Sequence, residues 1–69
     1  MNYLQAINYG NKLLKLSKID SSVLDSEILL AKVLKLRREK VIINSKRKIK
    51  KKNFDDFKSY INRRRKKEP

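Results

Sequence analysis

The sequence has 69 residues and a mass of 8.3 kDa, enough for one small domain and too little for a large active-site cleft. It contains no cysteine, histidine or tryptophan, which excludes disulfide bonds, zinc sites built from Cys and His, and catalysis by a thiolate or an imidazole. Its formal net charge of +13 is of the kind associated with nucleic acid, ribosomes or other anionic partners.

The positive charge is concentrated in the second half of the chain, because residues 35–69 account for +12 of the net +13. A purely compositional origin is an open alternative. Lys, Asn and Ile are strongly over-represented, and an AT-rich coding sequence produces that bias without selection for binding. The charge therefore does not identify a partner by itself.

No segment of the sequence has the character of a membrane span or a signal peptide. The longest uninterrupted apolar stretch covers only residues 28–31, far below the ~18 residues of a transmembrane helix. The polar start of the chain lacks the apolar core of a signal peptide. We therefore expect a cytoplasmic protein that does not enter a membrane.

The first predicted helix covers residues 3–16, where apolar side chains recur at intervals of three and four. Gly10 lies on the apolar side of this helix. Close approach by another helix would explain the glycine, but a tolerated loss of ~1 kcal/mol in helix propensity is the simpler interpretation.

The second predicted helix follows a polar break at residues 17–22. Ser22 and Asp25 have the spacing of a capping box, so we expect this helix to begin at Ser22. Residues 28–34 are apolar except for Lys32, which predicts a central helix packed on several sides.

Residues 38–44 contain three consecutive β-branched residues, which locally favour a strand. A lone strand would have no pairing partner, so we predict a short helix or turn that places Val41 and Ile42 on the core.

The last predicted helix follows the basic run, the name used here for residues 46–52, in which every residue except Ile49 is basic. Asn53 is a competent N-cap, and Pro69 would end the helix. Its core stripe comprises Phe54, Phe57, Tyr60 and Ile61. The sequence thus predicts one all-α domain over residues 1–69, a monomeric bundle of antiparallel neighbours with three main helices and one short helix.

The acidic residues do not form a catalytic pair. Asp25 with Glu27, and Asp55 with Asp56, have spacings that do not make neighbours on a helix. A single glycine also excludes a glycine-rich phosphate loop. We expect no catalysis by these residues, and we expect Glu27, which lies among apolar residues, to form a buried ion pair with Arg64.

The basic run has two interpretations of similar weight: a solvated loop, or a contact with phosphates or an acidic protein. If it contacts a partner, Arg47, Lys50 and Lys51 are the candidate residues. Stacking on nucleic-acid bases is not expected, because the nearby aromatic residues are at core spacing in the next helix.

Two short motifs follow one another in a consistent order. Residues 25–30 read Asp-Ser-Glu-Ile-Leu-Leu, and residues 63–69 read Arg-Arg-Arg-Lys-Lys-Glu-Pro. In these motifs the sequence resembles the N-terminal domain of the HemK/PrmC family, the peptide chain release factor glutamine methyltransferases. There a small helical bundle carries an Asp-x-Glu-Ile-Leu-Leu segment in its second helix and ends in an Arg-Arg-x-x-Gly-Glu-Pro turn. Lys67 departs from that pattern, since the family usually has glycine there.

The resemblance implies a domain that helps to hold the release factor, so that the Gln of its Gly-Gly-Gln loop reaches the active site. It also implies that a catalytic S-adenosylmethionine domain follows residue 69 in the parent, in some family members with a fused tRNA methyltransferase. The AT-rich bias is compatible with a bacterial parent. The glycine-rich loop and the Asn-Pro-Pro-Tyr motif of that catalytic domain are not in this sequence. We therefore expect no cofactor in these 69 residues and S-adenosylmethionine in the parent.

A free-standing basic helical protein that binds RNA or the ribosome is the alternative. The charge of residues 35–69 favours it, and a steep loss of RNA affinity with salt would distinguish it. Attachment to a membrane surface is less favoured, because the helices need their apolar faces for one another.

Overall fold

The computed structural model describes residues 1–66, which form four helices and no β-strand. The helices are α1 (Tyr3–Leu16), α2 (Ser22–Leu34), α3 (Arg38–Ile43) and α4 (Lys51–Arg65). The predicted all-α bundle of three main helices and one short helix is therefore confirmed. The turn around Lys67 and the stop at Pro69 lie outside the described residues.

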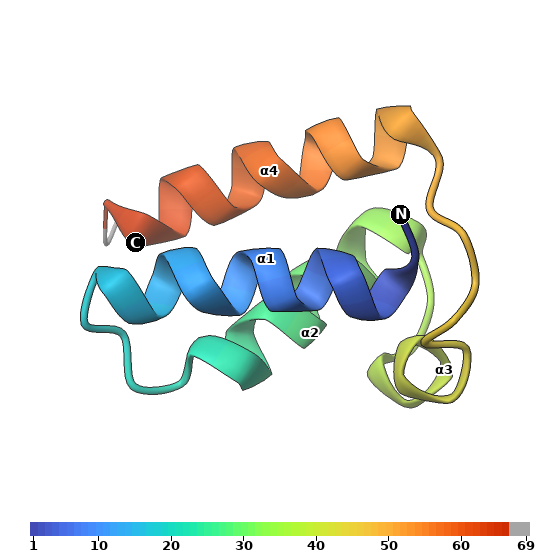
Figure 1. Cartoon of the computed structure of the whole chain (residues 1–69), viewed down its shortest axis with the longest axis horizontal. Helices are drawn as coiled ribbons and strands as arrows, with labels where there is room; N and C mark the ends of the chain where they lie inside the picture. The colour runs from blue at the N-terminus through green and yellow to red at the C-terminus, as the bar shows by residue number, and fades with distance from the viewer. Residues whose placement is uncertain (67–69) are drawn as a thin grey trace.

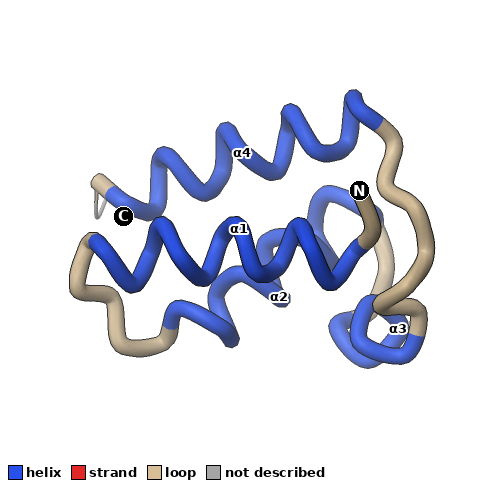
Figure 2. Tube along the Cα trace, viewed as in Figure 1, coloured by secondary structure: helices blue, strands red, loops and turns tan. Residues whose placement is uncertain are grey.

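The three long helices pack against one another, and α3 lies at the end of the bundle where the N-terminus is found (Figure 1). α1 and α4 both run away from that end, and α2 runs back toward it (Figure 2). The predicted antiparallel arrangement is thus right for α2 with α1 and with α4, but wrong for α1 with α4. The reason is that α3 and the basic run stay at one end and lead the chain from the end of α2 to the start of α4.

The core lies where α1, α2 and α4 meet. Its largest fully buried side chains are Leu14, Leu30, Val41, Phe57 and Ile61. α2 packs against the other three helices, as its apolar sequence predicted. Its outer side nevertheless leaves Leu24 and Ile28 about half exposed, so α2 is central without being enclosed.

The short helix α3 contributes less to the core than its sequence suggested. Val41 is fully buried, as predicted, but Ile42 keeps 44% of its surface exposed. Consecutive residues on a helix point about 100° apart, and in α3 only the side that carries Val41 faces the core.

Gly10 lies where α2 and α4 pack closely against α1. A β-carbon at this position would lie 2.8 Å from Ser26 Oγ and 2.9 Å from both Ile61 Cδ1 and Phe57 Cζ. These contacts are too short for any side chain, because all three neighbours are fully buried and cannot move aside freely. The simpler interpretation of Gly10 is therefore wrong: the glycine lets α2 and α4 approach α1.

Two helices end at a lysine in the left-handed conformation, Lys18 after α1 with φ 61° and Lys35 after α2 with φ 56°. In each case the next amide donates back across the last turn of the helix. The bonds run from Ile19 N–H to the Leu14 carbonyl (3.1 Å) and from Leu36 N–H to the Ala31 carbonyl (3.0 Å). This Schellman pattern usually has glycine at the left-handed position, where a side chain costs about 1 kcal/mol.

The predicted start of α2 at Ser22 is confirmed, but its predicted cap and the predicted start of α4 are wrong. The N-cap of α2 is Ser21 and Ser22 is its first helical residue, so the predicted capping box with Asp25 does not form. α4 begins at Lys51 with Lys50 as its N-cap, and Asn53 lies inside the first turn. Lys50 and Lys51 belong to the basic run, so α4 begins inside the run and not after it.

Candidate docking surface

The basic run is tied to the start of the chain. An isolated antiparallel bridge joins Asn2 to Lys48. Two flanking hydrogen bonds form it, from Tyr3 N–H to the Arg47 carbonyl (2.9 Å) and from Ile49 N–H to the Met1 carbonyl (2.9 Å). The backbone of the run is therefore fixed, although its charged side chains are exposed.

The start of α1 is itself ordered by local hydrogen bonds. The Asn2 side chain accepts from the Gln5 amide, and the Gln5 side chain accepts from the Asn2 amide, both at 2.8 Å. This reciprocal capping box orients residues 1–3 for their bonds with the basic run. The capped start of α1 thus holds residues 1–3 in the position from which they bond to the basic run.

A hollow of about 300 Å³ opens beside the basic run, next to the end of α2 and the start of α3. We call it the docking hollow. Its apolar lining comes from Tyr3, Leu34, Leu36 and Ile49. Its basic lining comes from Arg47, Lys48 and Lys50. Within the described chain no acidic residue lines it, so the hollow combines an apolar surface with uncompensated positive charge.

The structure brings two of the three candidate contact residues to this hollow. Arg47 and Lys50 line it, whereas Lys51 opens α4 and is not part of the lining. Contact of any of the three with a partner stays a prediction. Sequence patterns gave no indication of Tyr3, Leu34 and Leu36, because these residues meet the basic run only through the tertiary fold.

A second hollow of about 380 Å³ lies between α2 and α4. Lys32 Nζ lies 5.3 Å from the centre of the Tyr60 ring, and the Arg63 guanidinium carbon lies 6.0 Å from it. The Asp56 carboxylate partly neutralises these cations. This hollow is therefore less positive than the docking hollow, and the Tyr60 ring already interacts with cations of the protein itself.

The remaining aromatic residues are also engaged within the fold. Phe54 meets Tyr9 edge-on with ring centroids 5.3 Å apart, and Lys58 Nζ lies 5.3 Å from its centre. Phe57 and Tyr3 are buried. None of the five aromatic side chains, all within residues 1–66, is an exposed platform for base stacking.

The predicted ion pair between Glu27 and Arg64 is replaced by two others. Arg64 Nε donates to Asp25 Oδ2 at 3.1 Å, and Arg38 Nε donates to Glu27 Oε1 at 2.9 Å. Residues two apart on a helix point in nearly opposite directions, so Asp25 faces α4 while Glu27 faces α3. The arginines are about half exposed, so neither pair is the buried pair that was expected.

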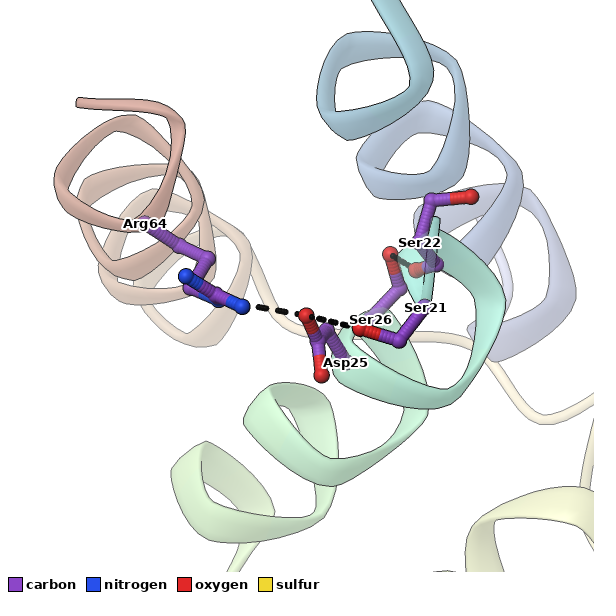
Figure 3. A network of polar contacts seen from close by, with 5 residues as sticks. All are labelled: Ser21, Ser22, Asp25, Ser26 and Arg64. Carbon is purple, nitrogen blue, oxygen red and sulfur yellow. Dashed lines mark hydrogen bonds and ion pairs between the residues drawn. The ribbon is translucent and has the colours of Figure 1, made fainter. Parts of the chain in front are cut away.

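The Asp25 pair belongs to a small polar network (Figure 3). The network lies at the end of the bundle opposite the N-terminus (Figure 1). The Ser21 hydroxyl donates to the same Asp25 oxygen at 2.9 Å, and the buried Ser26 hydroxyl donates to the Ser22 carbonyl at 2.7 Å. This network joins the start of α2 to the end of α4. We assign it a structural role.

Residues 1–66 contain no group of three His, Cys, Asp or Glu side chains that could hold a metal ion. Over the same range, no helix is long and apolar enough to cross a membrane. The one glycine is packed inside α1, and among the described residues no carboxylate lines the docking hollow.

A protein-family comparison covers nearly the whole chain. The family model described as "PrmC N-terminal domain" matches residues 5–69. No curated protein and no solved structure matches the chain.

Proposed function

Since the chain belongs to the PrmC N-terminal domain family, we propose that it is the part of a release factor glutamine methyltransferase that holds the release factor. The observation that carries the proposal is the match over residues 5–69, which includes all of α2, α3 and α4. In this proposal methyl transfer belongs to a separate S-adenosylmethionine domain of the parent protein.

The character of the surface supports a binding role. Backbone hydrogen bonds to Met1 and Tyr3 fix the basic run, and a fixed backbone loses little conformational entropy on binding. Positive charge near the docking hollow would also speed the approach of an acidic protein surface. A rigid domain of this kind would position a substrate protein without taking part in the chemistry.

The proposal is tested by titrating the 69-residue chain with a bacterial release factor in a calorimeter. We expect saturable one-to-one binding that survives physiological salt, and no methyl incorporation when labelled S-adenosylmethionine is added. An unrelated acidic protein of similar isoelectric point is the control. Equal affinity for the control and the release factor would refute release-factor recognition.

Binding to RNA or the ribosome is a second candidate, favoured by the net charge of +13. The engaged aromatic rings leave only phosphate contacts for this role. The affinity would then fall steeply with salt and be indifferent to base sequence. RNA binding that is tighter than release-factor binding at physiological salt would favour this candidate.

A further inference from the structure

The basic run has one free backbone edge, at Lys48. In the bridge with Asn2, the hydrogen bonds are made by the Arg47 carbonyl and the Ile49 amide, on either side of Lys48. The N–H and C=O of Lys48 itself therefore point away from Asn2. Neither group has a hydrogen-bond partner among residues 1–66. They form a short strand edge with one donor and one acceptor available.

The free edge lies next to the docking hollow, because Lys48 is one of the residues that line the hollow. Ile49, next to Lys48, turns toward the apolar lining and is half buried against the core. Side chains alternate along an extended segment. In a second extended segment paired with Lys48, the residues on either side of the one opposite Lys48 would thus point to the same face as Ile49. Their side chains would lie above the apolar lining.

The charge around this edge selects the kind of segment that can pair with it. Arg47, Lys48 and Lys50 surround the hollow, and no acidic residue of the described chain lines it. Lysine on an edge discourages pairing with a second copy of the same basic edge. An acidic segment would instead be attracted, so the charges favour one class of partner and oppose self-association.

We propose that the docking hollow binds an extended acidic peptide segment, which pairs its backbone with Lys48 and seats one apolar side chain on the lining. The residue opposite Lys48 exchanges both hydrogen bonds with it, and the apolar anchor is the neighbour of that residue. The inference rests on the proposed function in one respect: the release factor is taken to be the protein that supplies this segment.

The experiment uses the 69-residue chain labelled with ¹⁵N and the peptide acetyl-Glu-Asp-Leu-Asp-Glu-amide. We expect saturable shifts of the Lys48 and Ile49 amide signals, and slower hydrogen exchange at the Lys48 amide. A peptide with alanine in place of leucine should bind about tenfold more weakly, because it loses the apolar anchor. N-methylation of both aspartates should remove binding, since it blocks the backbone bond at an unchanged peptide charge.

Charge-reversed variants provide the matched control on the protein. Arg47→Glu/Lys50→Glu should weaken peptide binding at least about tenfold, whereas Lys46→Glu/Lys52→Glu changes the net charge equally and should weaken it less than about threefold. Both pairs of side chains are exposed, and an unchanged circular dichroism spectrum would verify the fold. Equal weakening by the two double variants, or full binding of the N-methylated peptide, would overturn the proposal.

A release factor and a twelve-residue oligouridine complete the test. Undiminished release-factor binding by Arg47→Glu/Lys50→Glu would overturn this inference and leave the proposed function standing. Peptide binding as described, without any release-factor binding, would support the docking mode and refute the proposed function. Oligouridine could instead bind more tightly than the peptide at physiological salt, and both double variants could weaken that binding equally. This outcome would overturn the inference in favour of unspecific phosphate contacts.

Discussion

The hairpin of α1 and α2 and the segment between α2 and α4, residues 35–50, are held in place by different forces. The hairpin supplies most of the buried apolar side chains, whereas Val41 is the one fully buried residue of the described segment 35–50. Backbone bonds to residues 1–4 fix that segment instead. The hairpin therefore maintains stability, and the segment is free to vary its exposed charges at little cost to the fold.

The largest expected difference between the two regions comes from the same substitution made in each. Leu30→Ala in the hairpin should lower the free energy of unfolding by about 2–5 kcal/mol, because Leu30 is fully buried. Leu36→Ala in the segment should cost about 1 kcal/mol or less, since Leu36 is 40% exposed. Urea denaturation followed by circular dichroism measures both, and similar losses would contradict the comparison.

Gly10→Ala tests the close approach at the centre of the hairpin. Alanine gains about 1 kcal/mol in helix propensity, but forcing a β-carbon against Ser26, Phe57 and Ile61 should cost more. We expect a net destabilisation of about 1–2 kcal/mol. Asn8→Ala, on the exposed side of the same helix, is the control and should be neutral or slightly stabilising. A stabilised Gly10→Ala protein would show that the helices can move apart freely.

Asn2→Ala tests how the segment is anchored. Loss of the side-chain cap should cost about 1 kcal/mol, because the Gln5 amide loses its acceptor. Loosening of residues 1–3 should also speed hydrogen exchange at the Ile49 amide, which donates to the Met1 carbonyl. Exchange at Leu14, which is fully buried near the other end of α1, serves as the internal control. An unchanged rate at Ile49 would mean that the basic run does not depend on the cap.

The smallest expected effects are gains. Lys18→Gly and Lys35→Gly should each stabilise the protein by about 0.5–1 kcal/mol, because glycine adopts the left-handed conformation without strain. Lys18→Ala and Lys35→Ala remove the same charge but keep a β-carbon, so they should bring no such gain. Thermal unfolding of all four variants compares the two helix ends. A gain in the alanine variants would attribute the effect to charge.

The helices were predictable because their apolar spacing is regular, and even the short α3 followed from excluding a lone strand. The ends of the helices were not predictable. Lysine at a left-handed position carries no signal in the sequence, and Asn53 has the chemistry of a cap without occupying that position. The partner of Arg64 could not be assigned either, because two acids lie close together in α2 and only their direction in space distinguishes them.

The docking surface was predictable only in part. A run of basic residues stood out in the sequence, and Arg47 and Lys50 line the hollow beside it. Its apolar lining and its free backbone edge both depend on pairing between the start of the chain and residues far along it. Local pattern contains no information about such a pairing.

The bridge between Asn2 and Lys48 also sets an order of events during synthesis. α1 and α2 are close in sequence and can associate as soon as both have left the ribosome. The bridge joins positions separated by most of the chain, so the first residues must wait, unpaired, until the basic run has emerged. The surface that we assign to partner binding therefore cannot form before the basic run has been made, and most of α4, which completes the core, is made after it.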